Sequence, residues 1–120
     1  MSTREAIYAA FDSAFSTVSA YLITHEGQQV GRVAFKHGAS VRCFAQVWGS
    51  DMAQGKAGGG GYDKATAAAE QAFARMGQGE TRPDVQHHVD AIKQAMTGPD
   101  GHRWISRIEA AGYSVQHVFG

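Results

Sequence analysis

Apolar and polar residues alternate along much of the first half of the chain with the two-residue period of β-strands. Three segments, 21–24, 30–36 and 41–48, are rich in strand-forming residues, and short turns at 26–28 and 37–38 separate them. Turns this short join antiparallel neighbours. The third segment has apolar residues on both faces, which indicates a central strand covered on each side. The pattern therefore predicts a three-stranded antiparallel meander.

An N-terminal helix is expected before the meander. Ile7, Phe11 and Val18 recur at helical spacing, and Ser2 and Glu5 have the spacing of a capping box. This spacing gives the helix one apolar stripe to bury.

Three helices are expected in the C-terminal half. The segment 62–76 is rich in alanine and ends before a glycine, 83–97 begins with a proline, and 102–111 carries three large apolar residues. Residues 113–119 have the composition of a last strand, added to an edge of the meander. The chain is thus predicted to be a single α+β domain, residues 1–120. Its expected parts are a three- to four-stranded antiparallel sheet, an N-terminal helix and three C-terminal-half helices.

Charge and composition restrict the class of protein. Eleven basic and eleven acidic residues give a net charge of zero, which argues against a chain built throughout for nucleic-acid binding and leaves room for a local basic patch. The single cysteine, Cys43, allows no internal disulfide and is expected to be a buried, unreactive residue in a strand. A secretory signal and a membrane-length apolar segment are both missing from the sequence. A cytoplasmic protein is the expectation.

The glycine-rich run at 55–64 is the most distinctive segment. It leads into the start of a predicted helix, where backbone N–H groups can hold an anion or a partner's carboxylate. The run matches neither the phosphate-binding loop of nucleotide hydrolases nor the dinucleotide fingerprint. A flexible connector and a partner-binding loop both remain open, and Trp48 is expected beside the loop as a hot spot. The predicted partner-binding residues are Trp48, Lys56, Gly58, Gly59, Gly60, Gly61, Tyr62 and Lys64.

No catalytic signature stands out in the sequence, so the prediction is a protein without enzymatic activity and without a cofactor. A metal site would need His87 and His88 to converge with His102, although two adjacent residues point about 100° apart on a helix. The spacing of these histidines matches no familiar metal-binding pattern. No metal is predicted, and the three histidines stay an open question.

Two segments, 55–58 and 61–68, resemble a motif of small proteins encoded by phages and mobile elements. In that group a Gly-rich loop is followed by Gly-Tyr-Asp-Lys and a helix of small residues, and residues 44–48 and 112–115 fit the same pattern. Some proteins of this kind inhibit host defence, anti-CRISPR proteins among them. The resemblance implies a protein that binds a host protein complex in the host-cell cytoplasm.

A second resemblance is to the double-stranded-RNA-binding domain, in which a helix, three antiparallel strands and a helix follow one another. Gly61 to Lys64, ahead of the alanines at 67–69, is similar to the helix start that contacts phosphates in that family. The resemblance implies nucleic-acid binding, for which the basic residues Arg42, Lys56, Lys64 and Arg75 are the candidates. An exposed strand edge also makes a homodimer an open alternative.

Overall fold

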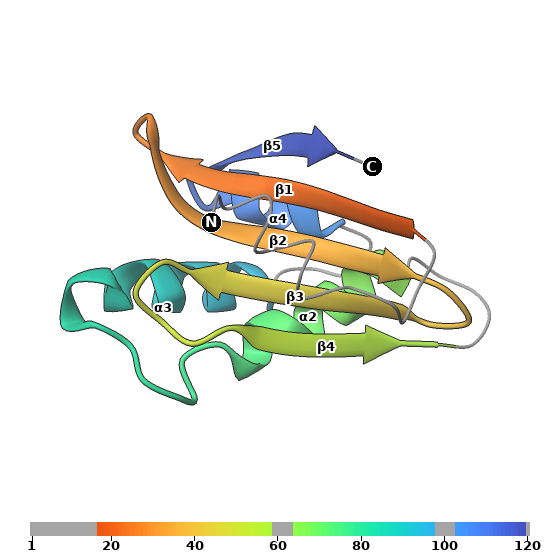
Figure 1. Cartoon of the computed structure of the whole chain (residues 1–120). Coiled ribbons are helices and arrows are strands. Elements are labelled where there is room, and N and C mark those ends of the chain that lie inside the picture. Colours follow the sequence, from red (N-terminus) through yellow and green to blue (C-terminus); the bar gives the residue numbers. More distant parts are fainter. Residues whose placement is uncertain (1–16, 59–63, 98–102, 120) are drawn as a thin grey trace.

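Five strands form one antiparallel sheet in the order β4-β3-β2-β1-β5 (Figure 1). The computed structural model describes residues 17–58, 64–97 and 103–119. The strands are β1 (Thr17–His25), β2 (Gln28–His37), β3 (Val41–Val47), β4 (Ala53–Ala57) and β5 (Ser114–Phe119). The first four form a meander, and β5 returns from the end of the chain to pair with β1.

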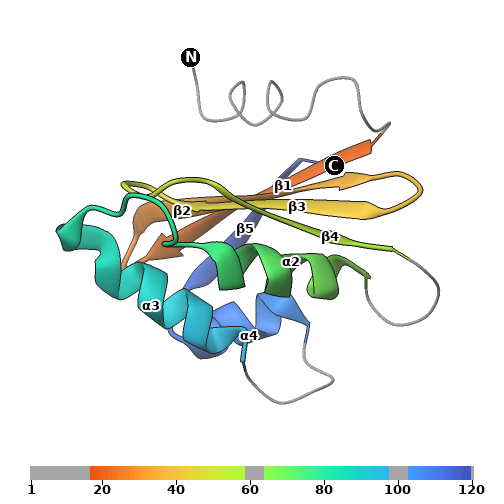
Figure 2. The ribbon, with the colours of Figure 1, turned by 90° about the horizontal axis from the view of Figure 1, so that it is seen from below.

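The helices cover one face of this sheet (Figure 2). They are α2 (Lys64–Arg75), α3 (Gln86–Ala95) and α4 (Trp104–Ala110), with a short 3₁₀ turn, η1 (Pro83–Val85), leading into α3. The chain is therefore an α+β protein with a helical layer on one side of an antiparallel sheet. No helix in the described segments is long and apolar enough to cross a membrane.

The predicted sheet of three to four strands is wrong, because the structure has five. The unexpected strand is β4, whose sequence Ala-Gln-Gly-Lys-Ala contains no β-branched or aromatic residue. It nevertheless pairs with β3 from Val41 opposite Ala57 to Ala45 opposite Ala53. Strand preference depends strongly on packing, so a segment without the usual composition can form a strand against a fitting neighbour.

One further boundary differs at the start of the chain, and one prediction there is not tested. Strand β1 begins at Thr17, four residues before the predicted segment at 21–24. The predicted N-terminal helix lies outside the described residues.

Helix α2 packs closely on β4 because both surfaces are made of small residues. A Cβ atom placed on Gly55 would lie 2.6 Å from the backbone nitrogen of Ala72 and would also collide with the carbonyl oxygen of Ala68. Ala68, Ala69 and Ala72 are fully buried in this contact layer. Only glycine on the strand and alanine on the helix permit backbones to come this near.

Side chains of α2 also close the outer edge of β4. The side-chain oxygen of Gln71 accepts a hydrogen bond from the backbone N–H of Lys56, at 3.1 Å. The guanidinium of Arg75 donates to the carbonyl of Gln54, at 3.0 Å. These contacts show that α2 runs antiparallel to β4 and occupies backbone groups that a further strand would need.

The core fills the space between the sheet and the helices. On β3 the inward residues are Val41, Cys43, Ala45 and Val47, all buried, as the alternation predicted. The indole of Trp104 on α4 packs edge-on against Tyr21, with ring centroids 5.0 Å apart. Burial of Cys43 raises the pKa of its thiol, so this cysteine is the unreactive core residue that the sequence indicated.

We expect Gly55→Ala to lower the free energy of unfolding by about 1–3 kcal/mol, because the added methyl group forces α2 away from β4. Chemical denaturation measures the change. Gly58→Ala is the matched control, since a Cβ there would meet only the Ser40 Cβ, at 3.6 Å. The control should be neutral or stabilising; equal effects of the two variants would contradict the close-packing argument.

Candidate functional site

The sheet register separates the predicted partner-binding residues into two groups. Ala57, at the end of β4, lies opposite Val41 at the start of β3, whereas Trp48 follows the end of β3. Seven residues of extended chain span roughly 20 Å. The expectation that Trp48 lies beside the glycine-rich loop is therefore wrong: the two are at opposite ends of β3.

The glycine-rich run connects β4 to α2, which returns antiparallel along that strand. Gly58 is exposed beyond the end of β4, and Lys64 is the first residue of α2. Gly59, Gly60, Gly61 and Tyr62 lie outside the described residues. The described geometry thus supports the role of a connector between two packed elements, while a binding role of the loop stays a prediction.

Basic side chains form a row across the sheet near this connector, on the face away from the helices. Lys36, Arg42 and Lys56 lie opposite one another on β2, β3 and β4. Lys36 is buried, whereas Arg42 and Lys56 are exposed. We call these three residues the basic row. Arg75, another predicted phosphate contact, lies at the far end of α2, where it binds the Gln54 carbonyl.

Near the other end of β3, Trp48 and Met52 lie beside Arg32 of β2. We call these three residues the indole patch. The guanidinium carbon of Arg32 lies 5.3 Å from the centre of a Trp48 ring, a cation–π distance. Met52 is the large hydrophobic side chain that is exposed among the described residues. Its sulfur lies 4.0 Å from a guanidinium nitrogen of Arg32.

Hydrogen bonds hold the indole patch in place. Arg32 Nε donates to the side-chain oxygen of Gln46 at 3.1 Å, and Gln46 Nε2 donates to the Ser50 carbonyl at 2.9 Å. The Ser50 hydroxyl in turn donates to the Val47 carbonyl at 3.1 Å. Partial burial lowers the pKa of Arg32 from its usual high value. The guanidinium is thus held over the indole, and Trp and Arg are residue types that are enriched at the hot spots of protein interfaces.

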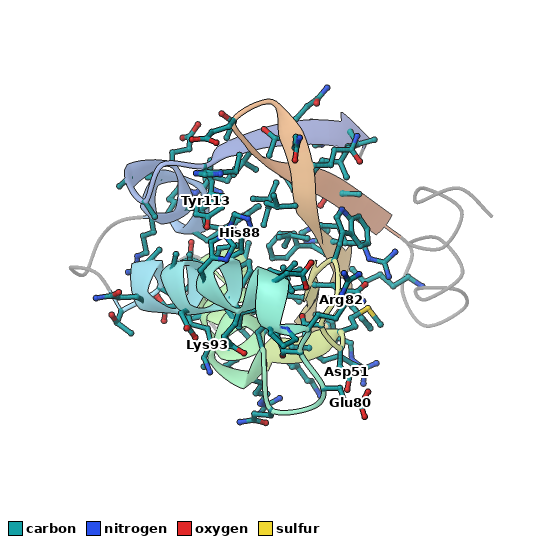
Figure 3. The ribbon with its side chains drawn as sticks, turned by 90° about the vertical axis from the view of Figure 1, so that its left-hand side faces the viewer. Asp51, Glu80, Arg82, His88, Lys93 and Tyr113 are labelled. Carbon is teal, nitrogen blue, oxygen red and sulfur yellow. The ribbon has the colours of Figure 1, made fainter. Side chains whose placement is uncertain are left out.

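A second loop supports the turn that carries this patch. The Asp51 N–H donates to the Glu80 carbonyl at 3.1 Å, and the Glu80 N–H donates to the Asp51 carboxylate at 3.0 Å. The Arg82 N–H donates to the Gly49 carbonyl at 2.8 Å. Figure 3 shows Asp51, Glu80 and Arg82 together at this end of the molecule. The hollow beside them, about 380 Å³, is lined by Gly49, by the hydroxyl residues Ser50 and Thr81, and by the three charged residues. The Ser50 hydroxyl donates to the Val47 carbonyl rather than to a base.

Three histidines and a tyrosine meet at the neighbouring corner of the fold. The Nδ1 atom of His88 lies 2.7 Å from the hydroxyl of Tyr113, and Figure 3 shows the two side chains side by side. The ring centroid of His88 is 4.0 Å from that of His87 and 5.3 Å from that of His25. Burial, with His87 and His25 nearby, lowers the pKa of His88, and burial raises that of Tyr113.

The histidine cluster differs from the one considered for a metal. Within residues 17–58, 64–97 and 103–119, no group of three or more His, Cys, Asp or Glu side chains could hold a metal ion, and His102 falls outside these ranges. Instead, His25 and Tyr113 join His88, although they are far from it in sequence. No local spacing signals this contact, because the ends of β1, α3 and α4 meet only in the folded chain.

Comparison with known proteins found no relative of this chain. Neither a family model, nor a curated protein, nor a solved structure matches the chain. The candidate site therefore rests on its own geometry.

Stability should fall as the pH drops below about 6.5, the ordinary histidine pKa. The folded pKa of His88 is lowered, so between that value and about 6.5 the unfolded chain binds more protons than the folded one. Thermal denaturation at a series of pH values measures this. His88→Asn, which keeps a polar group near Tyr113 and does not titrate, should flatten the pH dependence. An unaltered profile in the variant would show that His88 does not cause it.

Proposed function

We propose that this protein is a non-enzymatic protein-binding module and that the indole patch is its principal contact surface. The observation that carries the proposal is the Arg32–Trp48 stack with Met52 beside it, held by the hydrogen bonds of Gln46 and Ser50. A binding surface gains affinity when its large side chains are already ordered, because less conformational entropy is lost on association.

The composition of the patch also supports protein binding. Trp48 and Arg32 are partly exposed, so a partner can bury further apolar surface on them. Met52 adds a flexible, polarizable side chain that adapts to the shape of a partner. Aromatic residues, Met and Arg are the residue types enriched at interface centres.

The narrower proposal is that the partner is a host defence complex, bound in the cytoplasm. Its support is the sequence resemblance to small phage and mobile-element proteins, carried by residues 55–58 and 61–68. A net charge of zero suits an inhibitor that blocks a protein surface sterically better than one that imitates nucleic acid. Such an inhibitor needs no catalytic residue and no cofactor.

Nucleic-acid binding is a second candidate, and the basic row is the observation that favours it. Arg42 and Lys56 are exposed and lie directly opposite each other on β3 and β4. Two adjacent cations on one sheet face suit a phosphate backbone. The five-stranded sheet, however, differs from the three-stranded arrangement on which the resemblance to RNA-binding domains depended.

The test is a tagged pull-down from host lysate, with and without nuclease, using two double variants. Arg32→Ala with Trp48→Ala removes the stack, and we expect partner affinity to fall by about 30-fold or more, as for a hot spot. Arg42→Gln with Lys56→Gln removes the exposed charges of the basic row and should leave protein binding within a few-fold of wild type.

The opposite pattern would overturn the proposal. Recovery that disappears with nuclease, depends steeply on salt and is lost in the Arg42/Lys56 variant would establish the nucleic-acid alternative. Circular dichroism and the unfolding midpoint of both variants show whether the fold is intact, so that a loss of binding can be assigned to the surface.

A further inference from the structure

Strand β5 leaves one edge of the sheet open. It is the last strand in the sheet order, and no other segment of the described chain pairs with its outer side (Figure 1). The strand is six residues long, Ser-Val-Gln-His-Val-Phe. It contains no proline and no Lys, Arg, Asp or Glu, which are the residues that usually protect an edge from pairing.

The opposite edge is treated differently. There, Gln71 and Arg75 of α2 occupy the backbone N–H of Lys56 and the carbonyl of Gln54. Side chains of α2 thus occupy the β4 edge of the sheet, whereas the β5 edge is a strand without charged residues. The pairing of β5 with β1 is regular from Ser114 to His117, before a register shift at Val118. An uncharged edge strand with a regular segment is suited to accept another strand.

We propose that β5 pairs antiparallel with β5 of a second copy of this chain, with Gln116 at the two-fold axis. A strand without charges can face its own copy without like-charge repulsion, which would oppose pairing of a charged strand with itself. The two five-stranded sheets would then form one continuous sheet across the dimer. This inference is independent of the proposed protein-binding function.

The faces of β5 restrict the register to those in which one residue pairs with its own copy. Val115 lies opposite Ile23 and His117 opposite Tyr21, and both face the helices, where the His117 ring packs 4.9 Å from that of Tyr21. Gln116, opposite Leu22, lies on the other face and is exposed. A two-fold axis normal to the sheet pairs residues of the same face, so it must lie midway between the two copies of one residue. With Gln116 on the axis, Val115 meets His117 of the second copy.

The size of the contact sets the strength of the dimer. One pair of six-residue strands buries less than the ~1,200 Å² of a standard interface, so we expect a weak dimer that dissociates on dilution. The indole patch lies on β2, β3 and the following turn, away from this edge. A dimer would therefore present two indole patches, and bivalent binding can raise avidity well above the affinity of one copy.

Disulfide trapping tests the register directly. In Gln116→Cys, the introduced thiols of two copies face each other across the axis, with Cβ atoms about 5 Å apart, and should cross-link on mild oxidation. In Ser114→Cys, the corresponding thiols are separated by roughly 13 Å and should not. Both positions are exposed, and the native Cys43 is buried, so it does not compete. No cross-link in Gln116→Cys, or an equal one in Ser114→Cys, would overturn the proposed register.

Sedimentation of the unmodified protein between about 1 µM and 1 mM provides the second measurement. The expected mass rises with concentration from 12.8 kDa toward twice that value. Gln116→Lys and Gln116→Glu should each weaken self-association at the axis, and a mixture of the two should restore it. Gln94→Lys, an exposed change on α3, is the control and should dimerise as wild type does. A monomer at every concentration, or equal effects of the Gln116 and Gln94 variants, would refute the dimer.

Discussion

The close contact between α2 and β4 is the constraint on which the rest of this structure depends. Gly55 lets the backbone of the helix approach the strand, and the buried alanines of α2 complete the fit. Without this contact we would not expect residues 53–57 to form a strand, since none of them has a strong strand preference. The contact also lets Gln71 and Arg75 reach the strand edge, so one packing interaction creates the last strand on that side and ends the sheet there.

The antiparallel pairing of β4 with β3 decides where the candidate surfaces lie. Because the end of β4 lies opposite the start of β3, the glycine-rich connector and the basic row are at one end of β3, and Trp48 is at the other. A chain with no net charge thereby acquires one basic region and one aromatic region. The residue types of the first region are those that contact phosphates in nucleic-acid-binding proteins, and those of the second are enriched at protein interfaces.

The histidine cluster shows a different kind of dependence on the fold. His25, His88 and Tyr113 come from the β1–β2 hairpin, α3 and the segment before β5, and their rings meet because these elements end at one corner. Burial in this corner, with His87 and His25 nearby, moves the pKa of His88 downward, and this burial exists only in the folded chain. Sequence spacing brought only His87 and His88 together and suggested His102 as the third member.

The local pattern of residues was sufficient to predict strands at 30–36 and 41–48, which the structure shows at 28–37 and 41–47. It was also sufficient for the alanine-rich helix, the buried Cys43 and the neutral character of the chain. Each of these depends on residue type and on spacing between near neighbours, which are written in the sequence itself. The strand at 53–57, the distance between Trp48 and the connector, and the meeting of His25 with His88 and Tyr113 were decided only by the tertiary structure. They depend on contacts between residues far apart in the chain, and the energy of such contacts exists only once the helices lie on the sheet.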